Sequence, residues 1–340
     1  MLTIRRPLFL LIACLLCGYG SAAQKRPTSD TALAQTPPAA RKTILALAGN
    51  GTIEKVTRTA EAGEVVYEVD LKNGRVERSA TVAEDGTVLS REVFLAEVPA
   101  AAQTRIRTQI GSAKLVEIYW TFDTGQISYE VEVERNGQRQ SFGVAPDGKL
   151  MSVQIGVADA PVAVQKAIQA RIGTGTLADI YWAMEDDEVA YVVKVMRQGK
   201  EESFSVSVDG EFLSSTVMLS ETPPAVEKTI KQQLGTGRLG EIERSVEAGE
   251  VSYDVKTFRN GHRRSFSVSA DGKITSLQVL LAETPAEVQK TIKEQTGAGV
   301  ILRIDRTSEG SETAFEIEAK KEGKKFSFSV GPDGKLQEAK

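Results

Sequence analysis

Residues 222–235 read TPPAVEKTIKQQLG, which predicts a short amphipathic helix. Thr222 is expected to cap this helix and Pro223 to take its first position, because proline is tolerated there. Gly235 is expected to end it in the left-handed conformation that glycine adopts at low cost. Apolar residues recur every four positions and therefore share one face: Val226, Ile230 and Leu234.

The pattern changes after Gly235 from a period of about four to a period of two. Alternating apolar residues predict two strands: Val251, Tyr253 and Val255, then Phe266 and Val268. Asn260-Gly261 and Asp271-Gly272 are hairpin signals on either side of the later strand. With a first strand around 239–244 and a fourth around 274–281, this stretch predicts one helix followed by a four-stranded antiparallel meander. The helix should cover its apolar face, leaving a polar face for solvent or a partner.

The same pattern returns every 62 residues. Four markers keep this interval: prolines at 37, 99, 161, 223 and 285, glycines at 49, 111, 173, 235 and 297, Asp-Gly pairs at 85, 147, 209, 271 and 333, and aromatic residues at 67, 129, 191, 253 and 315. This register predicts an α+β protein of five tandem repeats. We name these the first to fifth segments: 36–97, 98–159, 160–221, 222–283 and 284–340. Residues 24–35 are expected to be a mobile polar linker.

Helix starts should differ between segments. In the fifth segment Thr284 and Glu287 have the spacing of a capping box. In the second and third segments Val98 and Ala160 occupy the cap position, so these helices should begin less firmly.

The fourth strands end in apolar residues just before the next segment begins: Val93-Phe94-Leu95, Val217-Met218-Leu219 and Val279-Leu280-Leu281. The fifth segment lacks such a tail. This difference predicts that neighbouring segments pack on one another. The sequence leaves open whether their sheets merge edge to edge or stay separate.

Residues 1–23 are interpreted as an export signal. Arg5 and Arg6 precede an apolar run that is too short to span a bilayer, and Ser21-Ala22-Ala23 supplies the small residues of a cleavage site. Leu11-Ile12-Ala13-Cys14 also matches a lipobox, so a lipid anchor at Cys14 is the alternative. Either route predicts an exported protein, located in the periplasm, the outer envelope or the medium, and no further stretch is apolar enough to cross a membrane.

Composition narrows the classes of function. Of the 340 residues 41% are hydrophobic and 26% are charged, and the net charge is −4, which gives no electrostatic case for nucleic-acid binding. Cys14 and Cys17 both lie in the leader, and His262 is the single histidine. A zinc cage, an iron–sulfur site and a cysteine nucleophile are therefore excluded for the mature chain, and no cofactor or metal is expected.

Two aromatic pairs are the candidate partner-binding residues: Tyr119, Trp120, Tyr181 and Trp182. The pairs lie 62 residues apart, hold the only tryptophans, and are replaced by polar pairs in the other segments. Alternation places Trp120 on the face of Ile118 and Tyr119 on the other, so one ring of each pair should be exposed. Paired large aromatics are typical of interface anchors. The alternative is that they pack the second segment against the third.

Three other motifs have a structural interpretation that we favour. GTGRLG (235–240) matches a dinucleotide-binding pattern but follows a helix and precedes a strand, so it is interpreted as a helix end. His262 lies beside a hairpin turn and is interpreted as an exposed turn residue rather than a catalytic base. EDDE (185–188) lacks the ligand spacing of a calcium loop and is interpreted as a solvated loop. The Asp-Gly pairs are interpreted as turns rather than metal ligands.

These residues together resemble a known family. The helix stretch at 222–230, the glycine turn, Tyr-Asp-Val at 253–255 and Ser-Phe-Ser-Val-Ser-Ala-Asp-Gly at 265–272 are similar to the PepSY-like domains related to beta-lactamase inhibitory protein. The resemblance extends over residues 36–340. It implies a helical layer on an antiparallel sheet, export from a bacterial cell, and binding or inhibition of hydrolases through the exposed sheet face. No target-binding residue is transferred by it.

The expected function is that of an exported, non-enzymatic protein that binds a protein partner, with inhibition of a peptidase or a beta-lactamase as its specific form. The alternative is a structural or adhesive spacer of the cell envelope. A third hypothesis, a hydrolase, would require an activity that is lost in a His262→Ala variant.

Overall fold

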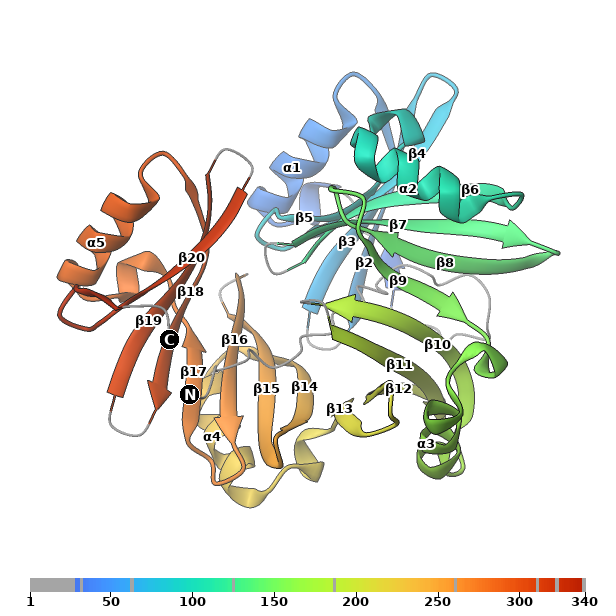
Figure 1. The fold of residues 1–340 in the computed structure, drawn as a ribbon. Coiled ribbons are helices and arrows are strands. Elements are labelled where there is room, and N and C mark those ends of the chain that lie inside the picture. Colours follow the sequence, from blue (N-terminus) through green and yellow to red (C-terminus); the bar gives the residue numbers. More distant parts are fainter. Residues whose placement is uncertain are drawn as a thin grey trace. The chain divides into compact units, whose positions relative to one another are not determined.

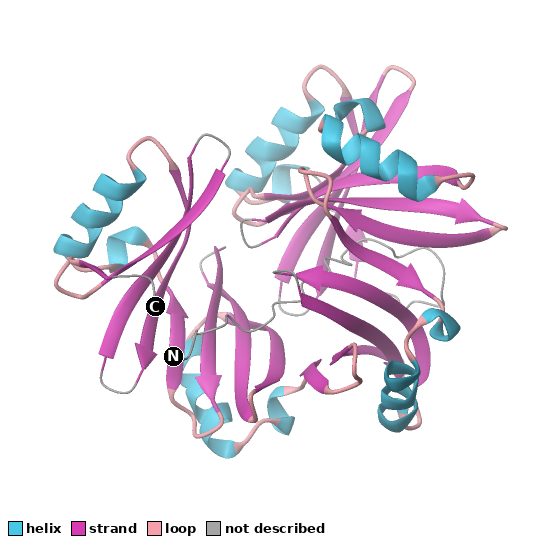
Figure 2. Cartoon of the chain, in the orientation of Figure 1, coloured by secondary structure: helices cyan, strands magenta, loops and turns pink. Residues whose placement is uncertain are grey.

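The computed structural model of the chain describes residues 28–30, 33–61, 64–123, 126–185, 188–259, 262–309, 312–321 and 324–337. The chain forms two compact units, an N-terminal unit that ends at Thr216 and a C-terminal unit that starts at Val217. Figure 1 colours the ribbon along the chain, and Figure 2 separates helices from strands. The predicted signal peptide, with Cys14 and Cys17, lies outside the described residues.

The N-terminal unit alternates short helices with runs of strands. Its elements in chain order are β1 (Thr28–Asp30), the 3-10 turn η1 (Leu33–Gln35), α1 (Pro38–Ala48), β2 (Thr52–Glu61), β3 (Glu64–Asn73), β4 (Val76–Ala83), β5 (Val88–Glu92), η2 (Leu95–Glu97), α2 (Ala100–Ile110), β6 (Lys114–Asp123), β7 (Gln126–Arg135), β8 (Gln138–Val144), β9 (Leu150–Ile155), η3 (Val157–Asp159), α3 (Val162–Ile172), β10 (Thr176–Glu185), β11 (Glu188–Arg197), β12 (Lys200–Ser207) and β13 (Phe212–Thr216).

The C-terminal unit continues the same order. Its elements are η4 (Leu219–Glu221), α4 (Pro224–Leu234), β14 (Arg238–Glu247), β15 (Glu250–Arg259), β16 (His262–Ser269), β17 (Ile274–Gln278), η5 (Leu281–Glu283), α5 (Ala286–Thr296), β18 (Val300–Glu309), β19 (Glu312–Lys321), β20 (Lys324–Val330) and β21 (Leu336–Gln337). The α-helices of the described chain begin at 38, 100, 162, 224 and 286, which keeps the 62-residue interval. The α+β class predicted from the sequence is confirmed.

Each unit is built on one continuous antiparallel sheet. In the N-terminal unit every described strand pairs with the next along the chain, from β1 to β13. The same holds from β14 to β21 in the C-terminal unit. The last strand of one segment therefore pairs with the first strand of the next, at β5–β6, β9–β10 and β17–β18. Within each unit the sheets of neighbouring segments merge edge to edge.

Each helix buries its own cluster of apolar side chains. Under α4, Val226 and Ile230 pack with Tyr253, Val255 and Phe266, the residues that the alternating pattern assigned to the apolar face. The apolar tails contribute to the same clusters: Val217 and Leu219 pack under α4, and Val279 and Leu281 pack under α5. These tails lie in the core of the following segment, as predicted.

The predicted helix caps are wrong. Pro223 is the N-cap residue of α4, Pro224 takes the first helical position, and no side chain caps the helix. The hydroxyl of Thr222 instead donates to the carbonyl of Leu219, 2.7 Å away, and so closes the turn η4. In the fifth segment Thr284 donates to Leu281 in the same way, so it forms no capping box with Glu287. The reason is the turn that precedes each helix, which has already engaged the threonine.

The helices end at glycine as predicted, but in another conformation. Gly235 has φ 53° and ψ −118°, so its φ is positive while its ψ is far from that of a left-handed helix. Glycine reaches this region without a steric penalty from a Cβ atom. GTGRLG therefore connects α4 to β14, which confirms its interpretation as a helix end.

The linker expectation is wrong for the residues of β1. Thr28, Ser29 and Asp30 pair with Thr59, Arg58 and Thr57 of β2. Sixty-two residues later, Ser90, Arg91 and Glu92 of β5 pair with Thr121, Trp120 and Tyr119 of β6. The register is identical, so β1 lies where the fourth strand of a preceding segment would lie. The chain thus covers this edge of the first segment with its own backbone, which limits edge-to-edge association there.

Candidate functional site

The face of each sheet opposite the helices is named the open face. Figure 2 shows the helices against the other side of their strands. On the open face, polar side chains alternate with the core residues, as predicted. Several of them are nevertheless buried, because neighbouring strands bring their side chains together into hydrogen-bonded clusters. These clusters lie at the joints where one segment's fourth strand meets the next segment's first strand.

The first joint joins the first segment to the second. The hydroxyl groups of Ser79 on β4 and Tyr119 on β6 lie 3.0 Å apart, and the Tyr119 hydroxyl lies 3.2 Å from Oε2 of Glu117. Burial raises the pKa of Tyr119, so the phenol stays protonated and can act as a donor. This joint holds the Tyr119 ring in one place, with its hydroxyl bonded on both sides.

The second joint uses an amide. Oε1 of Gln154 on β9 accepts a hydrogen bond from the backbone N–H of Ser141 on β8, at 3.0 Å. Nε2 of Gln154 donates to Oδ1 of Asp179 on β10, at 2.6 Å. One side chain therefore bridges the third strand of the second segment and the first strand of the third.

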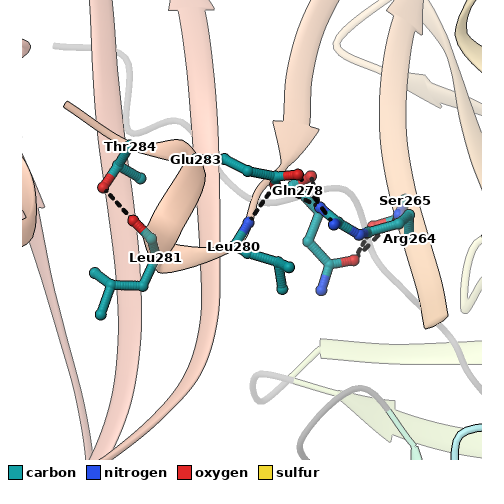
Figure 3. A network of polar contacts seen from close by, with 7 residues as sticks. All are labelled: Arg264, Ser265, Gln278, Leu280, Leu281, Glu283 and Thr284. Atoms are coloured by element: carbon teal, nitrogen blue, oxygen red, sulfur yellow. Dashed lines mark hydrogen bonds and ion pairs between the residues drawn. The ribbon is translucent and has the colours of Figure 1, made fainter. Parts of the chain in front are cut away.

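The joint between the fourth and fifth segments repeats this arrangement (Figure 3). Oε1 of Gln278 accepts from the backbone N–H of Ser265 at 3.1 Å. Arg303 on β18 donates to the Ser265 hydroxyl at 2.8 Å and to Oδ2 of Asp305 at 2.5 Å. The buried Asp305 is thus held by a guanidinium group, the pairing that a buried carboxylate requires.

An ion pair fixes the turn on the helix side of the same joint. Arg264 contacts Glu283 at 2.8 Å, and Glu283 also accepts from the backbone N–H of Leu280 at 2.7 Å. The bond from Arg264, together with that from Leu280, holds the pKa of Glu283 below its usual range. Leu280 itself is 50% exposed and stands outside the core.

A second row of open-face residues lies at the centre of each segment. A carboxylate from the second strand is placed among hydroxyl groups: Glu68 accepts from Thr59 at 3.2 Å, Glu130 from Ser128 at 3.4 Å, and Asp254 from Ser267 at 2.5 Å. In the third segment Val192 takes this position, and the hydroxyls of Ser205 and Ser214 bond one another instead, at 2.7 Å.

These central carboxylates have perturbed acidity. Burial raises the pKa of Glu130 to about 7, with the Ser128 hydrogen bond acting in the opposite direction. Burial also raises the pKa of Asp254, which is 5% exposed, against the hydrogen bond from Ser267 and the charge of Arg303. Such carboxyl groups change charge within the accessible pH range, which makes the open face sensitive to acidity.

The four predicted aromatic residues divide between the two faces. Trp120 and Trp182 pack against the helix-side cores of the second and third segments, and Trp120 stacks on Phe122 with ring centroids 6.2 Å apart. Tyr119 and Tyr181 lie on the open face at their joints. The alternation is confirmed, but the expected exposure is wrong: Tyr181 is only 4% exposed and Tyr119 is half-buried.

The cause is the merging of the sheets, which places β5 beside Tyr119 and Trp120 and β9 beside Tyr181 and Trp182. The second pair lies where the second and third segments meet, and the first pair where the first meets the second. Their role in binding a partner remains a prediction.

Sequence reasoning missed the joint clusters. Their signal is present, since serine recurs at the same position of all five segments: Ser79, Ser141, Ser203, Ser265 and Ser327. Glu117, Glu130 and Asp254 were likewise read as members of a solvated polar face. Only the merging of the sheets turns these separate polar residues into clusters.

The other sequence motifs have these outcomes. His262 is exposed at the start of β16, and the adjacent Asn260-Gly261 lies outside the described residues, as does the middle of EDDE. Gly86, Gly148, Gly210, Gly272 and Gly334 all have positive φ, in agreement with the turn interpretation of the Asp-Gly pairs. Across the described ranges, no group of three or more His, Cys, Asp or Glu side chains is arranged to hold a metal ion. No helix in the described part of the chain is long and apolar enough to cross a membrane.

Comparison with known proteins extends the family resemblance. Residues 251–338 match the model of the beta-lactamase-inhibitor-like, PepSY-like family. This match confirms the resemblance for the later part of the fourth segment and for the fifth. No curated protein matches the sequence.

Several solved structures are similar to part of the chain. A BLIP-like protein from Bacteroides fragilis NCTC 9343 is 18% identical, with a TM-score of 0.26 over 34% of this chain and 83% of that one. A DUF2874 family protein from Bacteroides uniformis ATCC 8492 is 16% identical, with a TM-score of 0.27 over 35% and 88%. A candidate periplasmic protein of the same family from Bacteroides vulgatus ATCC 8482 is 17% identical, with a TM-score of 0.25 over 37% and 95%.

Proposed function

We propose that this chain is an exported, non-enzymatic repeat protein that binds a protein partner through its open faces. The family match at residues 251–338 supports the proposal, because the description of that family is beta-lactamase-inhibitor-like. Inhibition of a hydrolase, a peptidase or a beta-lactamase, is the specific form that we propose. We also propose that the five 62-residue segments are copies of one unit.

The observation that carries the proposal is the preorganised polar surface of the open face. At the joint of the fourth and fifth segments, Ser265, Gln278, Arg303 and Asp305 hold one another through hydrogen bonds. Side chains that are already fixed lose little conformational entropy when a partner binds. A sheet face with ordered donors and acceptors is therefore suited to recognising a complementary protein surface.

Two matched variants test which face binds. Ser327→Arg places a charge on the open face at an exposed position of β20, and Gln295→Arg places the same charge at an exposed position of α5 in the same unit. Both proteins, and the unmodified chain, are used to capture partners from the native envelope fraction, with quantitative mass spectrometry of what co-purifies and of the mature N-terminus. We expect Ser327→Arg to lower the recovered partner about tenfold, equal to about 1.4 kcal/mol, and Gln295→Arg to leave it unchanged. Equal recovery with both variants would contradict binding through the open face.

A spacer function is the second candidate, and the continuous pairing of β-strands across the joints favours it. Such a sheet resists bending between segments because every joint is held by backbone hydrogen bonds. A spacer should keep its role when one 62-residue block is removed, since only its length changes. A binding protein that uses the deleted joint should lose its partner.

A further inference from the structure

One position on the open face carries a charge pair in each segment. It lies where the first and second strands of a segment face each other, just after the bulge of the first strand. Three of these pairs are direct strand neighbours, and in the fourth segment Nζ of Lys256 lies 2.8 Å from Oε2 of Glu241. The three neighbouring pairs are Lys55 with Asp70, Asp179 with Lys194 and Arg303 with Glu318. All four pairs combine opposite charges, which favours strand pairing.

The second segment breaks this rule. Glu117 on β6 lies opposite Glu132 on β7, so two carboxylates face each other. Glu132 is 6% exposed, and its Oε1 lies 2.6 Å from Arg139 on β8. Like charges placed directly opposite destabilise a strand pair, and here the pair is removed from water as well.

The groups around Glu117 do not compensate its charge. From β5 it faces Glu92, which lies opposite Tyr119, and from β7 it faces Glu132. On its own strand it accepts the hydroxyl of Tyr119 at 3.2 Å. Arg139 is the nearest cation on β8, and it is engaged by Glu132. Glu117 therefore completes the first joint from a position where its charge is opposed.

This environment favours the protonated acid. Burial raises the pKa of Glu117 above 4.5, and the charge of Glu132 acts in the same direction. A protonated Glu117 can donate a hydrogen bond to the Glu132 carboxylate, which replaces the missing opposite charge with a shared proton. Glu130, on the same face of β7, also has a pKa raised by burial, to about 7.

We propose that the first joint is a pH-sensitive element, in which the Glu117–Glu132 pair tightens the contact of Tyr119 with Ser79 in acid and loosens it near neutral pH. The joint itself stands independently of any partner. Only its consequence, regulation of binding at Tyr119, rests on the proposed function.

The direction follows from the raised values. A carboxyl whose folded-state pKa lies above its unfolded value of 4.5 contributes stability that is fully present below pH 4.5. That contribution is lost as the pH rises through the folded-state value. For Glu130 the loss falls between about pH 4.5 and about pH 7. Both acids on this face of the second segment therefore favour the closed joint at low pH.

The direct test is a carboxyl titration of the full-length protein by NMR, together with amide exchange at Ser79 and Tyr119. We expect Glu117 to titrate above pH 4.5 and to move down in Glu132→Gln. We expect the protection of these amides, corrected for intrinsic exchange, to fall by about tenfold or more from pH 5 to pH 8. A Glu117 midpoint at or below 4.5, or protection that does not change with pH, would overturn the proposal.

Two charge swaps separate the pair from general acid effects. Glu117→Lys gives the second segment the arrangement of Lys55 and Asp70, so the fall in protection with pH should shrink to the part that Glu130 causes. Lys256→Glu moves the like-charge pair into the fourth segment, where protection near Ser265 should now become pH-dependent. A Glu117→Lys protein that keeps the full pH dependence would contradict the proposal. Because these readouts need no partner, a failed capture experiment leaves them intact, and their failure leaves the capture experiment intact.

Discussion

At the scale of single residues, the open face shows how one site is filled in different ways. In the fourth segment Asp254 accepts the hydroxyl of Ser267. In the second segment the equivalent residues are Glu130 and Gly143, so a longer acid is matched by the loss of a side chain. A Cβ atom added at Gly143 would lie 2.8 Å from Oε1 of Glu130 and 2.7 Å from Oγ of Ser152. The two positions therefore vary together in volume.

This pairing predicts a rescue. Gly143→Ser alone should destabilise the N-terminal unit by about 1–3 kcal/mol, because the new side chain overlaps Glu130. Glu130→Asp shortens the acid, and the double variant reproduces the pair formed by Asp254 and Ser267. We expect it to recover most of the loss, with a coupling free energy of about 0.5–3 kcal/mol in a double-mutant cycle measured by denaturant unfolding. Strictly additive effects would contradict a shared site.

At the scale of elements, the sequence predicted the helices and strands well and their connections less well. Periodicity and turn glycines depend on local residues, so they located α4, β15 and β16 correctly. The predicted fourth strand, around 274–281, is divided into β17 and the turn η5. That turn also explains the wrong caps, because Thr222 and Thr284 bond to it instead of to the helix. A threonine before a proline has the same sequence signature in both arrangements.

The turn predicts a graded response at Thr222, which is buried and has the hydroxyl bond to Leu219. Thr222→Val keeps the shape of the side chain and copies Val98, which is buried at the same position of the second segment. We expect a cost of below about 1 kcal/mol, since only one hydrogen bond is removed. Thr222→Ala removes packing as well and should cost about 1–2 kcal/mol.

Both Thr222 variants are compared by denaturant unfolding, with the helix content followed by circular dichroism. If Thr222 capped α4 instead, valine and alanine would fray the helix equally. That outcome would contradict the role assigned to the turn.

At the scale of the whole molecule, the phase of the repeat was less accessible than its length. The 62-residue interval is visible in the sequence, but the segment boundaries drawn before each helix separate a fourth strand from the cluster that it completes. Val279 and Leu281, for example, pack under α5 of the next segment. The strand β1 shows the same phase, because it precedes the first helix and fills a fourth-strand position on β2. Only strand pairing, a long-range interaction, distinguishes these phases.

The identical register at successive joints predicts that one block can be removed from the N-terminal unit. Deleting residues 91–152 joins Ser90 to Val153, so that one hybrid strand pairs with β4 on one side and with β10 on the other. Ser90 and Ser152 are equivalent, and Gln154 would then reach Ser79 in place of Ser141. Because every contact of the hybrid strand has a counterpart in the intact chain, we expect cooperative unfolding with a midpoint within a few degrees of the parent.

The matched control removes one residue fewer, 91–151. It has nearly the same length and composition, but a shift of one residue turns every side chain of the strand to the other face. Val153 would leave the core and Gln154 would enter it, so we expect a midpoint lower by roughly 4 °C or more, measured by calorimetry of both proteins. Equal midpoints for the two deletions would mean that the joints do not depend on register, and the sheet would then not be the element that unites neighbouring segments.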